Sequence, residues 1–301
     1  MTKNVSVPEP KLDLKFIDVH CHLPFPRPKK NDRLPSDEEQ YYNYFKDGGI
    51  FLITCSIDIN TLKIILAFLK DKDKIGFSCG WAPQTVTYTS KNKHDKEWKE
   101  WINFLKENPG KYLAIGEIGL DFHHARTLDN RNKQVEVFKK IIENTMDLQK
   151  PYILHVRNAS EREFDRDNPN HRFNKRDGAN QELLKILKDY NIDPERVIWH
   201  CFSGPEQYGM LLSKQGFLLS VPSSAYGNNK WRKVTRNASL DSLVTETDSY
   251  YQHPYLRGPI NVPSNAKYAV AAIAFSHNVT QTLVSEKTIE NAIKFFNLNI
   301  I

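Results

Sequence analysis

The sequence predicts an α/β protein with the fold of a (β/α)8 TIM barrel, and two observations lead to this class. Eight short apolar runs alternate along the chain with segments of helical periodicity, which is the element order of such a barrel. The apolar character of the runs is nearly continuous, as expected of parallel strands that are covered on both sides. A chain of 301 residues with 40% hydrophobic residues suffices for one barrel, which takes about 200 to 250 residues.

The expected elements follow one another in a regular order. We expect strands at residues 16–22, 51–56, 75–81, 112–121, 151–156, 196–202, 216–221 and 243–248. We expect helices at residues 37–47, 60–71, 97–108, 130–148, 180–190, 205–214, 265–277 and 285–297. In the third of these helices, Trp98, Trp101 and Leu105 fall on one face, and Asn108-Pro109-Gly110 ends it.

The domain organisation is expected to be simple. Residues 1–15 form an N-terminal arm, residues 16–301 form a single barrel domain, and residues 158–179, rich in Asn, Asp and Arg, form an insertion loop. No apolar run approaches the ~18 residues needed to span a bilayer, and the polar start of the chain lacks the apolar core of a signal peptide. The four cysteines have no paired spacing, so we expect reduced thiols in a cytoplasmic protein.

The net charge of +6 mildly favours phosphorylated or polyanionic partners. Ordinary solubilising charge accounts for this value more readily, so the charge does not define a function class.

The first expected strand contains a candidate metal chelate. His20 and His22 are two residues apart, so on a strand both imidazoles point to the same face. Two histidines fall short of a full ligand set, and an unrelated pair, one in the core and one exposed, is about as common. The remaining ligands must therefore come from other strands.

Metal-capable side chains lie near the C-terminal ends of five expected strands, and in a barrel these ends meet at the active face. They are His20 and His22 on the first strand, Glu117 on the fourth, His155 on the fifth, His200 on the sixth and Asp248 on the eighth. His155 or His200 alone would more often be a hydrogen-bonded core residue. Together, the four imidazoles and two carboxylates are about enough for two divalent ions that share one carboxylate. Cys21 and Cys201 follow ligands directly, so on strands they would point away from the site.

At this point the chain resembles a known family. The segments Asp18-Val-His-Cys-His22, Gly116-Glu-Ile-Gly-Leu-Asp121, Ile153-Leu-His-Val-Arg157, His200-Cys-Phe-Ser-Gly204 and Glu246-Thr-Asp248 are similar to the ordered motifs of the TatD-type metal-dependent deoxyribonucleases. These enzymes belong to the amidohydrolase superfamily, and the similarity extends from about residue 16 to 297. The resemblance therefore implies a TIM barrel of the metal-dependent hydrolase type.

The resemblance also implies roles for the ligands. His20, His22 and Asp248 would hold a first metal, His155 and His200 a second, and Glu117 would bridge both. Asp248 would in addition orient or deprotonate the attacking water, so Asp248 and Glu117 are the expected catalytic residues. The two divalent ions would be Zn, Mn or Mg, since nitrogen and oxygen ligands suit all three. Asp18 and Glu246 would support neighbouring ligands or make ordinary structural hydrogen bonds.

The chain departs from the family pattern in three places. After the third strand it reads Gly80-Trp81-Ala82-Pro83-Gln84, where the family usually has Gly-x-His-Pro-His, so two imidazoles are missing from the mouth of the site. Asp248 is followed by Ser-Tyr-Tyr-Gln-His-Pro254 rather than by a small residue and proline. The insertion at 158–179 is longer than the family leads us to expect.

Substrate contacts are expected from residues that follow strand ends. Arg157 and Arg257 lie in family-like motifs and are the expected phosphate-binding residues. Other cations near the rim are more commonly solvated, namely Lys230, Arg232, Lys233 and Arg236. Trp81, Tyr226 and Trp231 are candidate surfaces for base stacking. His123, His124 and His253 share this rim without an assigned role.

The expected function is hydrolysis of phosphodiester bonds in DNA, with exonuclease action on single strands or strand ends. A second hypothesis keeps the metals and changes the substrate to an ester, amide or lactone, as in a deacylase or amidohydrolase, because barrels host many chemistries. A third is a non-enzymatic barrel that binds nucleic acid or protein, against which the complete ligand set argues.

Overall fold

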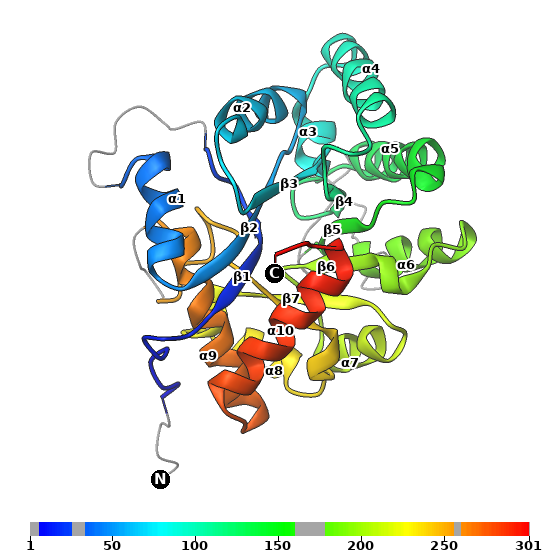
Figure 1. The fold of residues 1–301 in the computed structure, drawn as a ribbon. Helices are drawn as coiled ribbons and strands as arrows, with labels where there is room; N and C mark the ends of the chain where they lie inside the picture. The colour runs from blue at the N-terminus through cyan, green and yellow to red at the C-terminus, as the bar shows by residue number, and fades with distance from the viewer. Residues whose placement is uncertain (1–5, 26–33, 160–177, 256–259, 301) are drawn as a thin grey trace. The chain divides into compact units, whose positions relative to one another are not determined.

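The computed structural model of the chain describes residues 6–25, 34–159, 178–255 and 260–300 (Figure 1). No helix in these ranges is long and apolar enough to cross a membrane. The expected insertion at 158–179 lies mostly outside the described residues, as does Arg257.

Eight strands form one sheet in sequence order, from β1 to β8, and the fold is the expected (β/α)8 barrel. The strands are β1 (Phe16–Cys21), β2 (Gly49–Cys55), β3 (Ile75–Cys79), β4 (Ala114–Asp121), β5 (Tyr152–Arg157), β6 (Val197–His200), β7 (Leu218–Pro222) and β8 (Leu243–Glu246). All eight expected strands are therefore present, with ends that differ by a few residues from the prediction.

Ten α-helices are found in the described part of the chain, two more than expected. They are α1 (Asp37–Lys46), α2 (Ile59–Leu69), α3 (Pro83–Tyr88), α4 (Lys91–Glu107), α5 (Leu128–Thr145), α6 (Ala179–Asp189), α7 (Glu206–Lys214), α8 (Asn229–Thr235), α9 (Ala266–His277) and α10 (Gln281–Phe296). The two additional helices, α3 and α8, are only 6 and 7 residues long. Such short helices have too few turns to produce a clear apolar periodicity.

The chain divides into two compact units. The terminal unit comprises Met1–Thr54, Phe68–Gly76 and Cys201–Ile301, and the central unit comprises Cys55–Ala67 and Phe77–His200. The assignment of residues 16–301 to a single domain stays a prediction.

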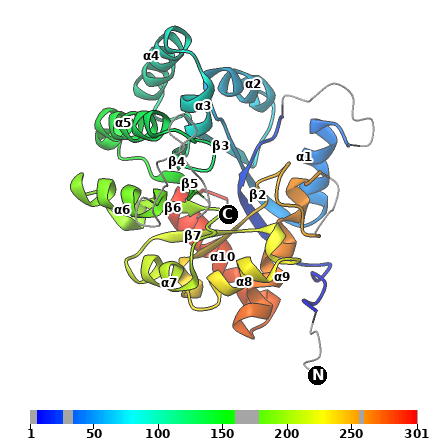
Figure 2. The same cartoon turned by 180° about the vertical axis from the view of Figure 1, so that it is seen from behind.

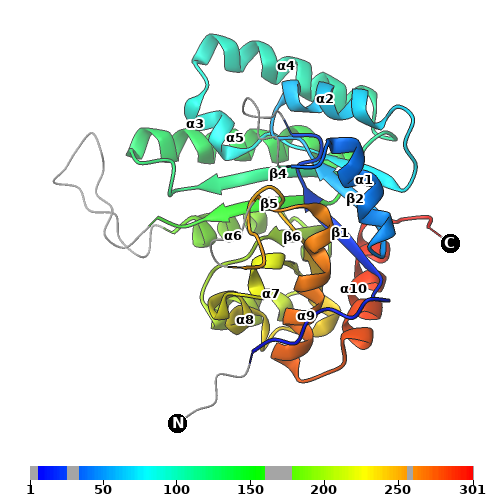
Figure 3. The ribbon, with the colours of Figure 1, turned by 90° about the vertical axis from the view of Figure 1, so that its left-hand side faces the viewer.

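In the terminal unit, the end of β1 lies next to the segment that follows β8. The backbone N–H of Asp248 donates to the carbonyl of His20 at 2.9 Å, and the N–H of His22 donates to the carbonyl of Ser249 at 3.0 Å. Helices α9 and α10, orange and red in Figures 1 and 3, pack on the fully buried β1, drawn in blue. Figure 2 shows α8 beside α9 on this unit. The ends of β1 and β8 are thus fixed next to each other.

In the central unit, β4, β5 and β6 pair in parallel, and the side view in Figure 3 shows β4 and β5 together. Gly119 on β4 has a φ of +142°, and a Cβ atom there would lie 2.1 Å from the carbonyl oxygen of His155. Glycine is therefore required at this position, both for the backbone conformation and for the space beside β5.

The structure corrects the interpretation of Trp81 as a surface for base stacking. Trp81 is only 1% exposed, its ring packs against Trp98 and Trp101, and its Nε1 donates to Nε2 of His94 at 3.3 Å. The indole is part of the core beneath α4. An aromatic residue directly after a strand can either pack or face solvent, and the sequence alone did not distinguish the two.

Candidate metal centre and active site

The terminal unit carries the first group of ligands, His20, His22 and Asp248. Oδ1 of Asp248 lies 3.4 Å from Nε2 of His22 and 3.9 Å from Nε2 of His20. The imidazoles of His20 and His22 meet edge to face, with ring centroids 5.0 Å apart. The structure thus brings together the three residues that the sequence assigned to one metal.

This group is held by a network around Asp18. The carboxylate of Asp18 is fully buried and accepts hydrogen bonds from the backbone N–H groups of His20 and Thr247, at 3.2 and 3.0 Å, and from the Thr247 hydroxyl. Burial raises the pKa of Asp18 well above its usual range, and the hydrogen bonds from Thr247 and His20 offset this only in part. Asp18 therefore ties the strand that carries the histidines to the segment that carries Asp248.

Asp248 itself has a left-handed backbone conformation, with a φ of +49°. Non-glycine residues adopt this region rarely and at a cost of about 1 to 3 kcal/mol, often at functional sites. The conformation turns the chain sharply just beyond β8. Its carboxylate is directed to the two histidines by this turn.

The central unit carries the second group, Glu117, His155 and His200. Oε2 of Glu117 lies 3.5 Å from Nδ1 of His155 and 3.6 Å from Nε2 of His200. Residues His155 and His200 are register partners on β5 and β6, and all three side chains are largely buried. One carboxylate oxygen is thus shared between two imidazoles.

The spacing within both groups distinguishes a metal site from a hydrogen-bonded cluster. Separations of 3.4, 3.5, 3.6 and 3.9 Å are longer than an N–H···O hydrogen bond, which spans 2.7–3.2 Å. Two ligands that each lie about 2.1 Å from a tetrahedral ion are about 3.4 Å apart. The carboxylate-to-imidazole pairs in each group therefore have the separations of two ligands that share an ion.

Sequence reasoning missed one functional residue, Asp121 at the end of β4. Its carboxylate is fully buried, and Oδ2 lies 3.0 Å from Nε2 of His155 and 2.7 Å from Nδ1 of His124. A ligand histidine usually donates its second ring N–H to such a carboxylate, which fixes the tautomer and the ring. Asp121 shares a strand face with Glu117, four residues earlier, and this alternation was the signal that could have identified it.

The charges of the carboxylates set the ionisation of His155. Burial lowers the pKa of His155, but the negative charge of Glu117 and the hydrogen bond to Asp121 outweigh burial and raise it to about 10. For Asp121, burial acts to raise the pKa, but hydrogen bonds with His155 and His124 hold it well below its usual range. Without an ion, His155 is therefore a cation between two carboxylates.

Gln84, one of the departures from the family motif, also contacts this group. Its Nε2 donates to Oδ2 of Asp121 at 2.9 Å and lies 3.3 Å from Nε2 of His155. An amide thus occupies a position beside His155 where the family pattern has an imidazole. Gln84 adds a neutral donor to this position.

Glu246 supports the backbone that follows β6. Its Oε2 accepts the hydroxyl of Ser220 at 2.6 Å, and the Ser220 oxygen in turn accepts the N–H of Cys201 at 3.0 Å. Because β6 ends at His200 and Cys201 has a φ of +47°, the strand alternation argument does not apply to Cys201. It holds for Cys21, whose buried thiol contacts the carbonyl of Ile53 on β2 at 3.6 Å.

The expected substrate-binding residues have different outcomes. Arg157 ends β5 and is exposed, as its role requires, and this role stays a prediction. Arg232 uses its guanidinium to bind the carbonyls of Ala225 and Tyr226, so it is a structural residue. Tyr226 is half-buried, and its hydroxyl donates to Glu9 at 2.8 Å.

The sequence matches the family model described as TatD related DNase over residues 17–297. The chain belongs to the TatD-related DNase family. It is 27% identical over 284 residues to an uncharacterized metal-dependent hydrolase of Methanocaldococcus jannaschii, with coverage of 94% of this chain and 98% of that protein. It is 23% identical over 291 residues to a Danio rerio protein provisionally named as a deoxyribonuclease, with coverage of 94% and 97%.

Solved structures of the TatD family have the same fold. The crystal structure of a TatD homologue from Escherichia coli superposes with a TM-score of 0.76 at 22% identity, and covers 94% of this chain and 98% of its own. A TatD family hydrolase from Entamoeba histolytica has a TM-score of 0.74 at 17% identity, with coverage of 95% and 99%. Both likenesses confirm the TIM barrel, and the family model confirms the resemblance derived from the motifs.

Proposed function

We propose that this TatD-family protein is a metal-dependent hydrolase that cleaves phosphodiester bonds of DNA. The observation that carries the proposal is the spacing of 3.4 to 3.9 Å between the carboxylate oxygens of Asp248 and Glu117 and the imidazole nitrogens next to them. A family named for DNA hydrolysis supplies the substrate class.

Each ligand group would hold one divalent ion. His20, His22 and Asp248 would form the first ligand set, and His155, His200 and Glu117 would form the second. The donors are imidazole and carboxylate, which suit Zn, Mn or Mg. When bound, such ions acidify a water molecule and neutralise charge on phosphate oxygens.

Three side chains have the remaining roles of proton acceptance, orientation of a ligand and phosphate binding. Asp248, whose Oδ1 faces both histidines of its group, accepts a proton from the attacking water. Asp121 keeps the proton of His155 on Nε2, so that Nδ1 presents its lone pair toward Glu117. The exposed Arg157, at the end of the strand that carries His155, binds a substrate phosphate.

Single-stranded DNA or strand ends are the proposed substrates, because the matching family is described as DNase-related and the exposed Arg157 ends the strand that carries His155. Arg257, which lies outside the described residues, is proposed as a second phosphate contact. We infer a reducing, cytoplasmic location, because none of the four cysteines, all of which lie in the described ranges, forms a disulfide.

The test compares substrates and ligand variants. Purified protein, with its metal content measured, is incubated in Mg, Mn or Zn with end-labelled single-stranded DNA, duplex DNA, and aminoacyl ester and lactone substrates. We expect cleavage of DNA, and a drop of about 10²- to 10⁴-fold in Glu117→Gln and Asp248→Asn.

The matched control is Asp241→Asn, which changes an exposed carboxylate in the same chain. It should keep wild-type activity, and all three variants should keep the circular dichroism of the parent. Intact DNA beside a cleaved ester or lactone would favour the deacylase or amidohydrolase alternative. Full DNase activity in Glu117→Gln or Asp248→Asn would refute the assigned site.

A further inference from the structure

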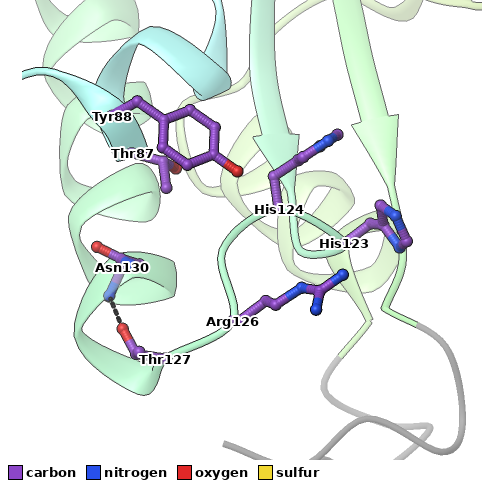
Figure 4. A pocket seen from close by; sticks show the side chains of 7 residues that line it. All are labelled: Thr87, Tyr88, His123, His124, Arg126, Thr127 and Asn130. Carbon is purple, nitrogen blue, oxygen red and sulfur yellow. Dashed lines mark hydrogen bonds between the residues drawn. The ribbon is translucent and has the colours of Figure 1, made fainter. Parts of the chain in front are cut away.

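A cavity of about 600 Å³ opens in the central unit beside the C-terminal end of β4. Its lining includes Tyr88 at the end of α3, the neighbouring His123, His124 and Arg126, and Asn130 on α5 (Figure 4). Ligand pockets commonly measure about 300 to 1,000 Å³, so this one has room for a single nucleotide.

The turn that lines the cavity, which contains His123 and His124, is stabilised by hydrogen bonds to Asp121. Oδ1 of Asp121 accepts the backbone N–H groups of His123 and His124, each at 3.1 Å, and Oδ2 binds Nδ1 of His124 at 2.7 Å. The Thr127 hydroxyl caps α5 by accepting the N–H of Asn130 at 3.0 Å. The wall of the cavity is therefore a preorganised turn.

The exposed groups on this wall suit an anion next to a flat ring. Arg126 is exposed and makes no hydrogen bond or ion pair with another residue in the described ranges. Tyr88 is 68% exposed, and its ring stands edge to face with His124 at 6.3 Å, as Figure 4 shows. An arginine fork binds phosphate, and an exposed aromatic face stacks on a base.

The cavity is also connected to the second ligand group. The same Oδ2 of Asp121 that binds His124 in the cavity wall accepts the hydrogen bond from the ligand His155 at 3.0 Å. In addition, the N–H of Phe122 donates to the carbonyl of Arg157 at 2.8 Å, which fixes the turn against the end of β5. The end of β5 that carries Arg157 is therefore joined by this hydrogen bond to the turn that lines the cavity.

We propose that this cavity is a nucleotide subsite for single-stranded nucleic acid, in which Arg126 binds a backbone phosphate and Tyr88 stacks on the base of the same nucleotide. The subsite serves a nucleotide next to the scissile bond. This inference rests on the proposed function, because it deepens the substrate assignment of the same site.

Binding to metal-free protein tests the subsite independently of cleavage. Fluorescence anisotropy with labelled hexathymidylate and with an abasic hexamer of the same backbone gives Kd at several salt concentrations. Arg126→Gln should raise Kd about three- to tenfold for both probes and reduce the slope of log Kd against log salt by about 0.7. Tyr88→Ala should weaken hexathymidylate about tenfold and leave the abasic probe unaffected, while Tyr88→Phe keeps wild-type affinity.

The control is Lys140→Gln, an exposed cation on α5 that lies ten residues, or about 15 Å along the helix, from Asn130 in the cavity wall. It removes the same charge beyond the Debye length of about 10 Å and should leave Kd unchanged. Equal effects of Arg126→Gln and Lys140→Gln, or a loss in Tyr88→Ala that is the same for both probes, would overturn the subsite.

The proposed function fails in a different way. Wild-type protein that binds hexathymidylate through Arg126 and Tyr88 but cleaves neither DNA nor bis(p-nitrophenyl) phosphate would refute the nuclease and keep the subsite. Wild-type cleavage of both substrates, with unaltered KM for DNA in Arg126→Gln, would refute the subsite and keep the nuclease.

Discussion

The substitution Asp121→Asn removes the charge that orients His155 and preserves the shape of the side chain. Both oxygens of the buried carboxylate are used. Oδ1 accepts two backbone N–H groups, and Oδ2 accepts Gln84 Nε2 at 2.9 Å and contacts the rings of His124 and His155. The amide NH2 of asparagine must therefore face donors at either position.

The magnitude follows from the two possible orientations of the amide. With the NH2 at the Oδ1 position, the partly buried backbone N–H groups of His123 and His124 lose their acceptor, at about 1 kcal/mol each. With the NH2 at the Oδ2 position, His155 would accept at Nε2 and carry its proton on Nδ1, the nitrogen that faces Glu117 at 3.5 Å. We therefore expect a loss of at least about 2 kcal/mol in unfolding free energy or a 10- to 100-fold loss in metal affinity.

Two measurements separate these outcomes. Chelator competition gives the affinity for Zn or Mn, and urea denaturation of the metal-free protein gives the free energy of unfolding. Asp129→Asn, at an exposed acid in the first turn of α5, is the control and should change neither quantity. Unaltered metal affinity together with unaltered stability in Asp121→Asn would refute the positioning role.

Three further predictions concern protonation, backbone space and metal removal. The pKa of His155 is raised from 6.5 to about 10, so its protonation stabilises the metal-free fold fully below pH 6.5, and this contribution is lost as the pH rises through 10. Binding of a metal ion displaces the same proton, so the metal affinity measured by chelator competition should rise roughly tenfold per pH unit between pH 7 and 9. A metal affinity that does not change with pH would contradict this argument. Gly119→Ala should lower the free energy of unfolding by about 3 kcal/mol or more in urea titrations, while Gly110→Ala, where a Cβ would meet nothing within 4 Å, should be near neutral. Removing the metal with a chelator should lower the midpoint temperature of thermal unfolding, because an ion at a free concentration of 1,000 times its Kd stabilises the folded state by about 4 kcal/mol. The decrease in midpoint should be smaller in Asp248→Asn, which lacks one ligand.

The strands and the long helices could be predicted because each has a local signal. β4 and β5 are continuous apolar runs, and α4 carries a regular apolar face with a Pro-Gly stop, although it begins at Lys91 rather than at residue 97. The short α3 and α8 have no such signal. Trp81 was misjudged because its burial depends on how α4 packs on it, through Trp98 and Trp101, and the sequence pattern predicts the helix but not where it docks.

The metal ligands could be predicted because a polar group in an apolar strand stands out. His20 and His22 share a face by alternation, and the barrel order brings other strand ends into consideration. For Asp121, alternation with Glu117 indicates the strand face, but its contact with Nε2 of His155 is seen only in the structure. The cavity at Tyr88 and Arg126 likewise depends on α3, a helix that the sequence did not predict.

The two ligand groups differ in how much of the polypeptide must be synthesised before each can form. The hydrogen bond from Thr247 to Asp18, which anchors the His20 group, joins residues separated by 229 positions. The Glu117 group needs only β4, β5 and β6, all of which precede residue 201. During synthesis on the ribosome, all residues of the Glu117 group are therefore made before the His20 group is complete, because Asp248 follows β8.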